Sequence, residues 1–251
     1  MTTVQSEVGR IRLFEDFCGA QYPIAFDDAV HGVGPFRVGG EGIVESAGGI
    51  AALDTDGLNG VGHFTTGDTD VDTTFIGTSI CLDVALMGTL VLEARVRFPT
   101  ALTAKAAFIG FSNICADDLD LEEVINYASG EVVTLTAPSQ AGFYFSSQFD
   151  DSTSWHTVHK GGTTSSVVDT TAIDLPDDDP TADEFQVLRV EIDNNATTRW
   201  YVDGVLKKTL AGAVSTATDL AALVAVTENG GAVAQLDLDY LLVTANRDWT
   251  V

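Results

Sequence analysis

Basic residues are scarce in this chain. Twelve lysines and arginines stand against 37 aspartates and glutamates, a formal net charge of −25, and the isoelectric point is near 4.1. Nucleic-acid backbones and anionic membranes would repel such a surface. The composition therefore argues against nucleic acid and membrane as partners, and it is typical of a protein kept soluble by its charge.

Cysteine is also rare, and its three copies, Cys18, Cys81 and Cys115, are far apart and odd in number. Without a Cys-x-x-Cys pair or a cluster of cysteine and histidine, the sequence predicts neither a zinc site nor a disulfide framework. Each cysteine is most simply a small apolar core residue.

Long apolar runs are missing as well. No stretch of about 18 apolar residues occurs, so no segment is expected to span a membrane. The N-terminal stretch Met1–Glu7 has neither the basic flank nor the apolar run of a secretory signal. We therefore expect synthesis in a host cytoplasm without export through a signal peptide.

What the sequence does contain is a period-two alternation of apolar and polar residues, which is typical of half-buried antiparallel strands. In Leu90–Phe98, for example, the apolar residues share one face, and Glu93, Arg95 and Arg97 share the other. Asp203-Gly204 between two apolar runs predicts a hairpin turn. The strands predicted in this way are Leu90–Phe98, Ala106–Ser112, Ala141–Phe149, Trp155–Lys160, Phe185–Asp193, Thr198–Leu210, Ala221–Thr227 and Gln235–Thr244.

The first 80 residues are richer in glycine, with short runs at Gly34–Val38, Gly42–Ala47 and Gly60–Thr65. We expect a single domain over residues 1–251. Residues 90–247 would form its core, and residues 1–80 would form a looser part that could dock on a neighbouring subunit. Asp120–Glu123 resembles a capping box and predicts a helical turn or two over residues 120–128.

Three segments carry a resemblance to a known family: Val187–Asp193, the following Arg199–Leu206, and the closing Leu236–Arg247. Together they resemble the concanavalin A-like lectin/glucanase (laminin-G-like) superfamily, and Phe14–Phe17 resembles its opening strand. The resemblance implies an all-β fold, an antiparallel two-sheet jelly-roll sandwich of about 12 strands with at most one or two short helices. It does not by itself imply a function, because the fold hosts lectins, hydrolases and structural proteins.

Catalytic patterns are weak. Family-16-type glycoside hydrolases in this superfamily carry Glu-x-Asp-x-Glu on one strand, and the nearest match is Gln235–Asp239, whose first residue is an amide. Alternation places His156 and His159 on opposite faces, so they cannot easily bind one metal ion. No Gly-x-Ser-x-Gly elbow occurs. We therefore expect a protein that is not an enzyme.

Two groups of residues are candidates for binding. Tyr144 and Gln148 alternate with phenylalanines and lie near Trp155, so an aromatic ring with an amide could hold a sugar. A solvated sheet face is the competing interpretation. Asp117, Asp118 and Asp120 offer oxygen ligands for calcium, without the spacing of an EF-hand loop. Apart from this possibility of calcium, we expect no cofactor.

The function that these observations favour is that of a virion structural protein of a tailed bacteriophage. It would be a capsid decoration or cement protein, or a head-fibre or tail component. Its partners would be the major capsid protein or other virion proteins, and it would form homo-oligomers. The alternative is a lectin-like module that binds glycans; a glycoside hydrolase is the third hypothesis.

Overall fold

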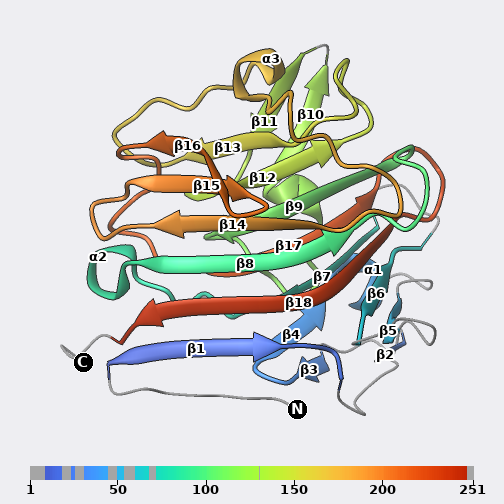
Figure 1. The fold of residues 1–251 in the computed structure, drawn as a ribbon, viewed down its shortest axis with the longest axis horizontal. Helices are drawn as coiled ribbons and strands as arrows, with labels where there is room; N and C mark the ends of the chain where they lie inside the picture. Colours follow the sequence, from blue (N-terminus) through green and yellow to red (C-terminus); the bar gives the residue numbers. More distant parts are fainter. Residues whose placement is uncertain are drawn as a thin grey trace.

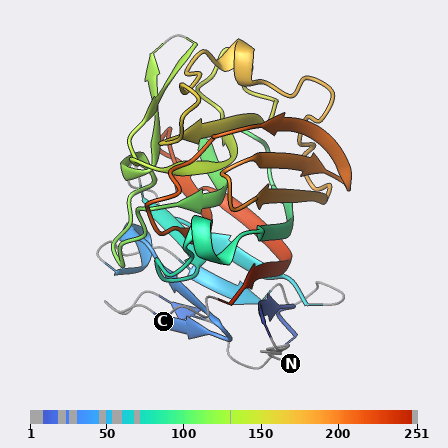
Figure 2. The same ribbon diagram turned by 90° about the vertical axis from the view of Figure 1, so that its left-hand side faces the viewer.

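The computed structural model describes residues 9–18, 24–25, 31–44, 50–53, 60–67, 72–129 and 131–247. Within these ranges the chain forms two large antiparallel sheets, which confirms the predicted β-sandwich (Figures 1 and 2). The first sheet has nine strands in the order β16-β15-β14-β8-β18-β6-β5-β2, with β1 also pairing with β18. The second sheet has seven strands in the order β13-β12-β9-β17-β7-β4-β3.

The strands of the first sheet are β1 (Arg10–Glu15), β2 (Ile24–Ala25), β5 (Ile50–Leu53), β6 (Gly62–Thr65), β8 (Leu90–Arg97), β14 (Gln186–Ile192), β15 (Thr198–Val202), β16 (Val205–Leu210) and β18 (Gln235–Asn246). Those of the second are β3 (His31–Val33), β4 (Phe36–Gly39), β7 (Thr73–Gly77), β9 (Lys105–Ser112), β12 (Gln140–Ser146), β13 (His156–Lys160) and β17 (Ala221–Glu228). A separate hairpin pairs β10 (Ile125–Ser129) with β11 (Val132–Leu135).

The helices are short: α1 (Glu41–Val44), α2 (Val84–Met87), α3 (Thr170–Ile173) and the 3₁₀ turn η1 (Leu121–Glu123). An aspartate begins each of α2, α3 and η1, because its carboxylate accepts a hydrogen bond from a backbone N–H of the first turn. The described residues thus hold two helical turns more than we expected. None of these helices is long and apolar enough to cross a membrane.

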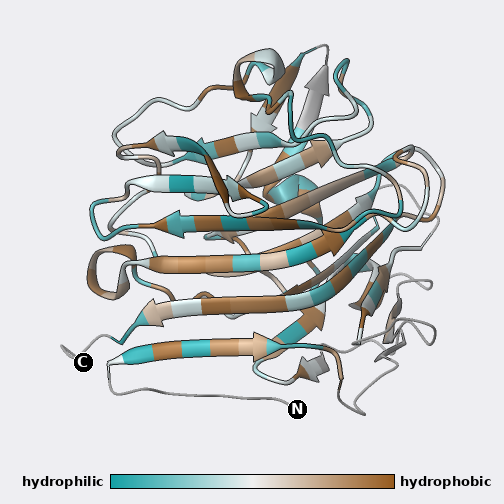
Figure 3. Cartoon of the chain, viewed as in Figure 1, coloured by the Kyte–Doolittle hydropathy of each residue, from teal (hydrophilic) through white to brown (hydrophobic). Residues whose placement is uncertain are grey.

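The main core lies between the two sheets. Strand β8 buries Leu90, Leu92, Ala94 and Val96 there, and the residues between them are half-exposed, as the alternation predicted. Figure 3 shows this alternation of hydrophilic and hydrophobic residues along the strands of the first sheet. Trp200 crosses from one sheet to the other, because its indole Nε1 donates to the carbonyl of Gly142 at 2.9 Å.

A second apolar core covers the far side of the second sheet. Phe108, Tyr144 and Val158 contribute to it from the sheet, and Leu121, Val133 and Ile173 come from η1, β11 and α3. The strands β9, β12 and β17 are therefore buried on both faces. The β10–β11 hairpin and α3, which form part of this cover, lie at the top of Figures 1 and 2.

The described part of the first 80 residues is built into both sheets. The 12-residue β18 pairs along one edge with β8; its other edge is divided between β6, at Gln235–Leu238, and β1, at Leu241–Asn246. Strands β4 and β7 extend the second sheet. The short strands of this region and the β10–β11 hairpin raise the number of strands in the described residues to 18, above the expected count.

Two local predictions have different outcomes in this frame. The Asp203-Gly204 turn is confirmed, with φ of 49° and 77°, the two positive values that a type I′ turn requires. The helix predicted over residues 120–128 is wrong beyond its first turn. After η1 the chain becomes β10, because Val124 and Ile125 are drawn into the second core.

The three short glycine-rich runs also differ in outcome. Gly34–Val38 leads into β4 and Gly60–Thr65 into β6, as expected. Gly42–Ala47 begins in α1, and its last three residues lie outside the described part of the chain.

Candidate functional site

The outer face of the first sheet, turned away from the second sheet, gathers arginines. Alternate residues of β1, β8, β14 and β15 point outward, and the residues between them point into the core. Six of the chain's 12 lysines and arginines lie on this one face: Arg10, Arg12, Arg95, Arg97, Arg189 and Arg199. In a chain of net charge −25 this concentration marks the face as distinct.

A groove of about 580 Å³ is hollowed into this face over β1, β8, β14 and the end of β18. Most of its lining is polar. The lining residues are Arg10, Ile11, Arg12, Thr89, Val91, Arg189, Glu191, Asp193, Thr244, Ala245 and Asn246.

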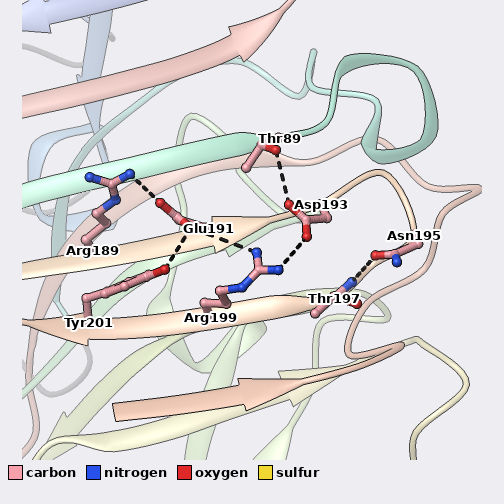
Figure 4. A network of polar contacts seen from close by, with 8 residues as sticks. All are labelled: Thr89, Arg189, Glu191, Asp193, Asn195, Thr197, Arg199 and Tyr201. Carbon is pink, nitrogen blue, oxygen red and sulfur yellow. Dashed lines mark hydrogen bonds and ion pairs between the residues drawn. The ribbon is translucent and has the colours of Figure 1, made fainter. Parts of the chain in front are cut away.

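A hydrogen-bonded network forms one wall of the groove (Figure 4). Glu191 accepts hydrogen bonds from the guanidinium of Arg189 and from the hydroxyl of Tyr201, the latter at 3.0 Å. Asp193 accepts from Arg199 at 2.8 Å and from the hydroxyl of Thr89 at 3.1 Å. Both wall carboxylates are therefore held in fixed positions.

The same contacts shift the pKa values of the wall residues. The hydrogen bond from Arg199 lowers the pKa of Asp193 and raises that of Arg199, since it stabilises both charged forms. Burial, with Glu191 beside it, raises the pKa of Tyr201, so this hydroxyl stays a neutral donor. The wall offers fixed hydrogen-bonding groups and no exchangeable proton near neutral pH.

The pattern continues along the sheet beyond the groove. Glu93 accepts from Arg189 at 3.4 Å and from the hydroxyl of Tyr240 at 2.9 Å. Arg95 pairs with Asp239 at 2.7 Å, and the two arginines of β8 lie over the ring of Phe185. Each of these carboxylates is thus already engaged by a cation or a phenol.

Arg10 and Arg12 differ from the other four arginines of this face. Among the residues that the structure describes, neither has a carboxylate partner; Arg12 lies over the ring of Phe14 with its guanidinium carbon 5.7 Å from the centroid. Both are exposed and line the groove. They leave two uncompensated positive charges at its edge.

The residues predicted to bind a sugar do not come together. Tyr144 is 3% exposed in the second core, Trp155 is 1% exposed in the first, and the second sheet lies between these cores. Gln148 is exposed, and its amide donates to the carbonyl of Asn229 at 2.7 Å. The prediction fails for the two aromatic residues, because a sugar needs an exposed ring face and a second apolar layer covers this one.

The aspartates predicted to bind calcium serve other contacts. Asp117 pairs with Arg37, and Asp120 caps η1 by accepting from the backbone N–H of Glu122 at 2.8 Å. Asp118 is exposed. In the described ranges no three histidine, cysteine, aspartate or glutamate side chains are grouped so that they could hold a metal ion. The cation of Arg37 also disfavours calcium here.

The segment nearest to the glycosidase pattern, Gln235–Asp239, is held in ion pairs. Asp237 is 1% exposed and contacts Arg97, at 2.7 Å, and His63. The pairing of β18 with β8 shifts between Leu238 and Tyr240, so the alternation is broken beside Asp239. A buried carboxylate that neutralises two bases is poorly suited to attack a sugar.

Sequence reasoning missed the groove because its residues are spread over four strands. The signal was nevertheless present: Arg10-Ile-Arg12 and Arg189-Val-Glu191-Ile-Asp193 place charges on one face by the same alternation that revealed the core. Only the order of the strands shows that β1 lies beside β18, close to β8 and β14.

No known sequence family and no curated protein matches the chain. Solved structures do. A protein of unknown function from Shewanella oneidensis MR-1 matches with a TM-score of 0.61 at 11% identity, over 100% of this chain and 92% of the other. A family 16 endo-glucanase from Bacteroides ovatus matches with 0.50 at 13%, over 92% and 99%. The Emp47p carbohydrate recognition domain matches with 0.49 at 10%, over 91% and 96%.

At these identities the comparisons establish the fold and leave the activity open. They agree with the two antiparallel sheets described above. The protein thus has the concanavalin-like jelly-roll fold, as its sequence predicted.

Proposed function

We propose that this protein is a non-enzymatic carbohydrate-binding module whose ligand lies in the groove on the outer face of the first sheet. The observation that carries the proposal is the groove itself, about 580 Å³ and lined by fixed polar side chains. Ligand sites of this size commonly combine an apolar floor with a few convergent polar groups. Ile11, Val91 and Ala245 are the apolar part of this lining.

The state of the carboxylates favours binding over hydrolysis. A glycosidase needs one carboxyl group that gives up a proton and a second that attacks or activates water. On this face Glu93, Glu191 and Asp193 are engaged by arginine or tyrosine, and Asp237 is buried against Arg97. Groups held in this way orient sugar hydroxyls better than they transfer protons.

The fold is compatible with this proposal. The Bacteroides protein of the same fold is an endo-glucanase, which acts on a saccharide. For the present chain the likeness supports only the kind of ligand, since the two share 13% identity.

The proposal is tested by filling the groove. Val91 lines it from β8, half-buried on the outer face, so Val91→Trp should occupy the space. Val187→Trp is the matched control, because Val187 lies on the same face of β14 outside the lining. On an array of saccharides, we expect the wild type and Val187→Trp to bind the same glycan and Val91→Trp to lose it.

Two results would contradict the proposal. Equal binding by Val91→Trp would place the ligand elsewhere, and no binding to any saccharide would remove the function. Release of shorter products after long incubation with the bound glycan would contradict its non-enzymatic part.

The virion role remains a second candidate. It is supported by the open edge of β16, where Val205 and Leu206 are 56% and 49% exposed and would be covered by a neighbouring virion subunit. Incubation with capsids of the tailed phage that encodes the chain tests it: the wild type should co-sediment, and Leu206→Glu should not. A wild type that stays in the supernatant would contradict this role.

A further inference from the structure

We infer that the ligand of the groove is an anionic saccharide, one whose sugars carry a carboxylate or sulfate group, and that Arg10 and Arg12 bind that group. This inference rests on the proposed function and specifies its ligand. It follows from the charges of the groove, from the places of the two arginines, and from the side chains beside them.

The charges of the groove do not balance. Its lining holds three arginines, Arg10, Arg12 and Arg189, and two carboxylates, Glu191 and Asp193. The carboxylates are already engaged by Arg189 and by Arg199 behind the wall. The charges of Arg10 and Arg12 therefore remain for a ligand. The rest of the chain is strongly acidic, so an anionic ligand would be guided to this place by local charge alone.

Strand β1 fixes where the two guanidinium groups lie. Ile11 and Leu13 pack against the main core, which turns Arg10 and Arg12 outward onto the same face. Two residues of one strand on one face are about 6.8 Å apart along the strand. The pair therefore forms a row along one edge of the groove, opposite the wall of β14.

Each arginine has a neutral hydrogen-bonding neighbour. In the pairing of β1 with β18, Arg10 lies opposite Asn246 and Arg12 opposite Thr244, and both neighbours line the groove. Directly opposed side chains are close enough to act on one ligand, with their Cβ atoms about 5 Å apart. A guanidinium that takes the anionic group, with an amide or hydroxyl beside it for the ring hydroxyls, suits a charged sugar.

Guanidinium chemistry agrees with this ligand. The planar fork of arginine donates two parallel hydrogen bonds to carboxylate-like oxygens, and such charge-assisted bonds are about twice as strong as neutral ones. A neutral sugar would leave both charges without a counter-charge. The groove should therefore discriminate between saccharides by charge.

The test is a calorimetric titration with three hexasaccharides: a neutral β-glucan, an oligogalacturonate that carries carboxylates, and a sulfated galactan. We expect at least one charged ligand to bind at least tenfold more tightly than the neutral one, and which of the two it is identifies the group. Added salt should weaken the charged ligand selectively.

The double variant Arg10→Gln/Arg12→Gln should weaken binding of the charged ligand by about 10- to 100-fold, the loss expected for two charge-assisted contacts. Its binding to the neutral glucan should not change. Arg247→Gln is the matched control, since it removes the same charge from an exposed arginine outside the groove lining. Thermal unfolding of each variant verifies that it folds.

Two results would overturn the inference: neutral binding as tight as both charged ligands, or full charged binding by the double variant. The proposed function fails in a different way. If Val91→Trp abolishes binding of a neutral glycan, the groove is a saccharide site and only the inference falls; if no saccharide binds the wild type, both fall.

Discussion

At the scale of single residues, Arg97 shows how strongly burial decides the worth of a charge. Its guanidinium pairs with two carboxylates at nearly equal distances, Asp237 at 2.7 Å and Asp183 at 3.0 Å. The side chain of Asp237 is 1% exposed and that of Asp183 is 74% exposed. Water screens the second pair and hardly reaches the carboxylate of the first.

We therefore predict unequal results from two identical substitutions. Asp237→Asn should lower the free energy of unfolding by about 2–3 kcal/mol, because it leaves Arg97 and His63 without their buried counter-charge. Asp183→Asn should lower it by less than about 0.5 kcal/mol. Urea unfolding measures both, and equal shifts of the midpoint would contradict the argument.

A second residue-scale prediction concerns pH. Burial lowers the pKa of His156, although nearby Asp151 opposes the shift. The unfolded chain then binds a proton more readily than the folded one, so this contribution to stability is complete above about pH 6.5 and is lost as the pH falls below it. His156→Phe, which cannot titrate, should gain stability relative to the wild type between pH 7 and pH 5. Parallel stability curves would show that His156 does not carry the effect.

At the scale of elements, alternation predicted the exposed sheet better than the covered one. In β8 and β14, one face meets the core and the other meets solvent, so their sequences show which side chains point outward. In β12 both faces are buried, and alternation could not reveal that Tyr144 lies under a second layer made by β10, β11, η1 and α3. That layer comes from loops with no period of their own, and for this reason the sugar site was predicted on the wrong sheet.

The hairpin between β15 and β16 gives a prediction at this scale. Gly204 has φ of 77° with open space around it, so a Cβ there meets backbone strain and no clash. Gly204→Ala should lower stability by about 1 kcal/mol. Gly32→Ala, in equally open space without positive φ, should be nearly neutral. Chemical denaturation checks both, and an equal loss in the two variants would show that the turn is not the cause.

At the scale of the whole molecule, the described N-terminal strands and the predicted core share the same sheets. β18 has β8 on one edge and β1 with β6 on the other, so the end of the chain is completed by its beginning. The sequence suggested the sandwich over residues 90–247 through its hairpin and alternation. It could not show that β1 borders a groove, because that contact spans more than 200 residues.

This arrangement predicts a single unfolding unit. Calorimetry should give one heat-absorption transition whose calorimetric and van't Hoff enthalpies agree. Amides of β1 and β6 should then exchange with deuterium about as slowly as those of β8. Two transitions, or fast exchange confined to the N-terminal strands, would instead support the looser region that the glycine content suggested.

The most direct test of the account is to map the bound saccharide on the chain by hydrogen exchange, with and without the tightest glycan of the array. We predict slowed exchange in Arg10–Glu15, in Thr89–Glu93 and around Glu191–Asp193, the segments that line the groove. Slowed exchange only in the second sheet or its covering layer, with these three segments unchanged, would contradict the central claim that this groove is the binding site.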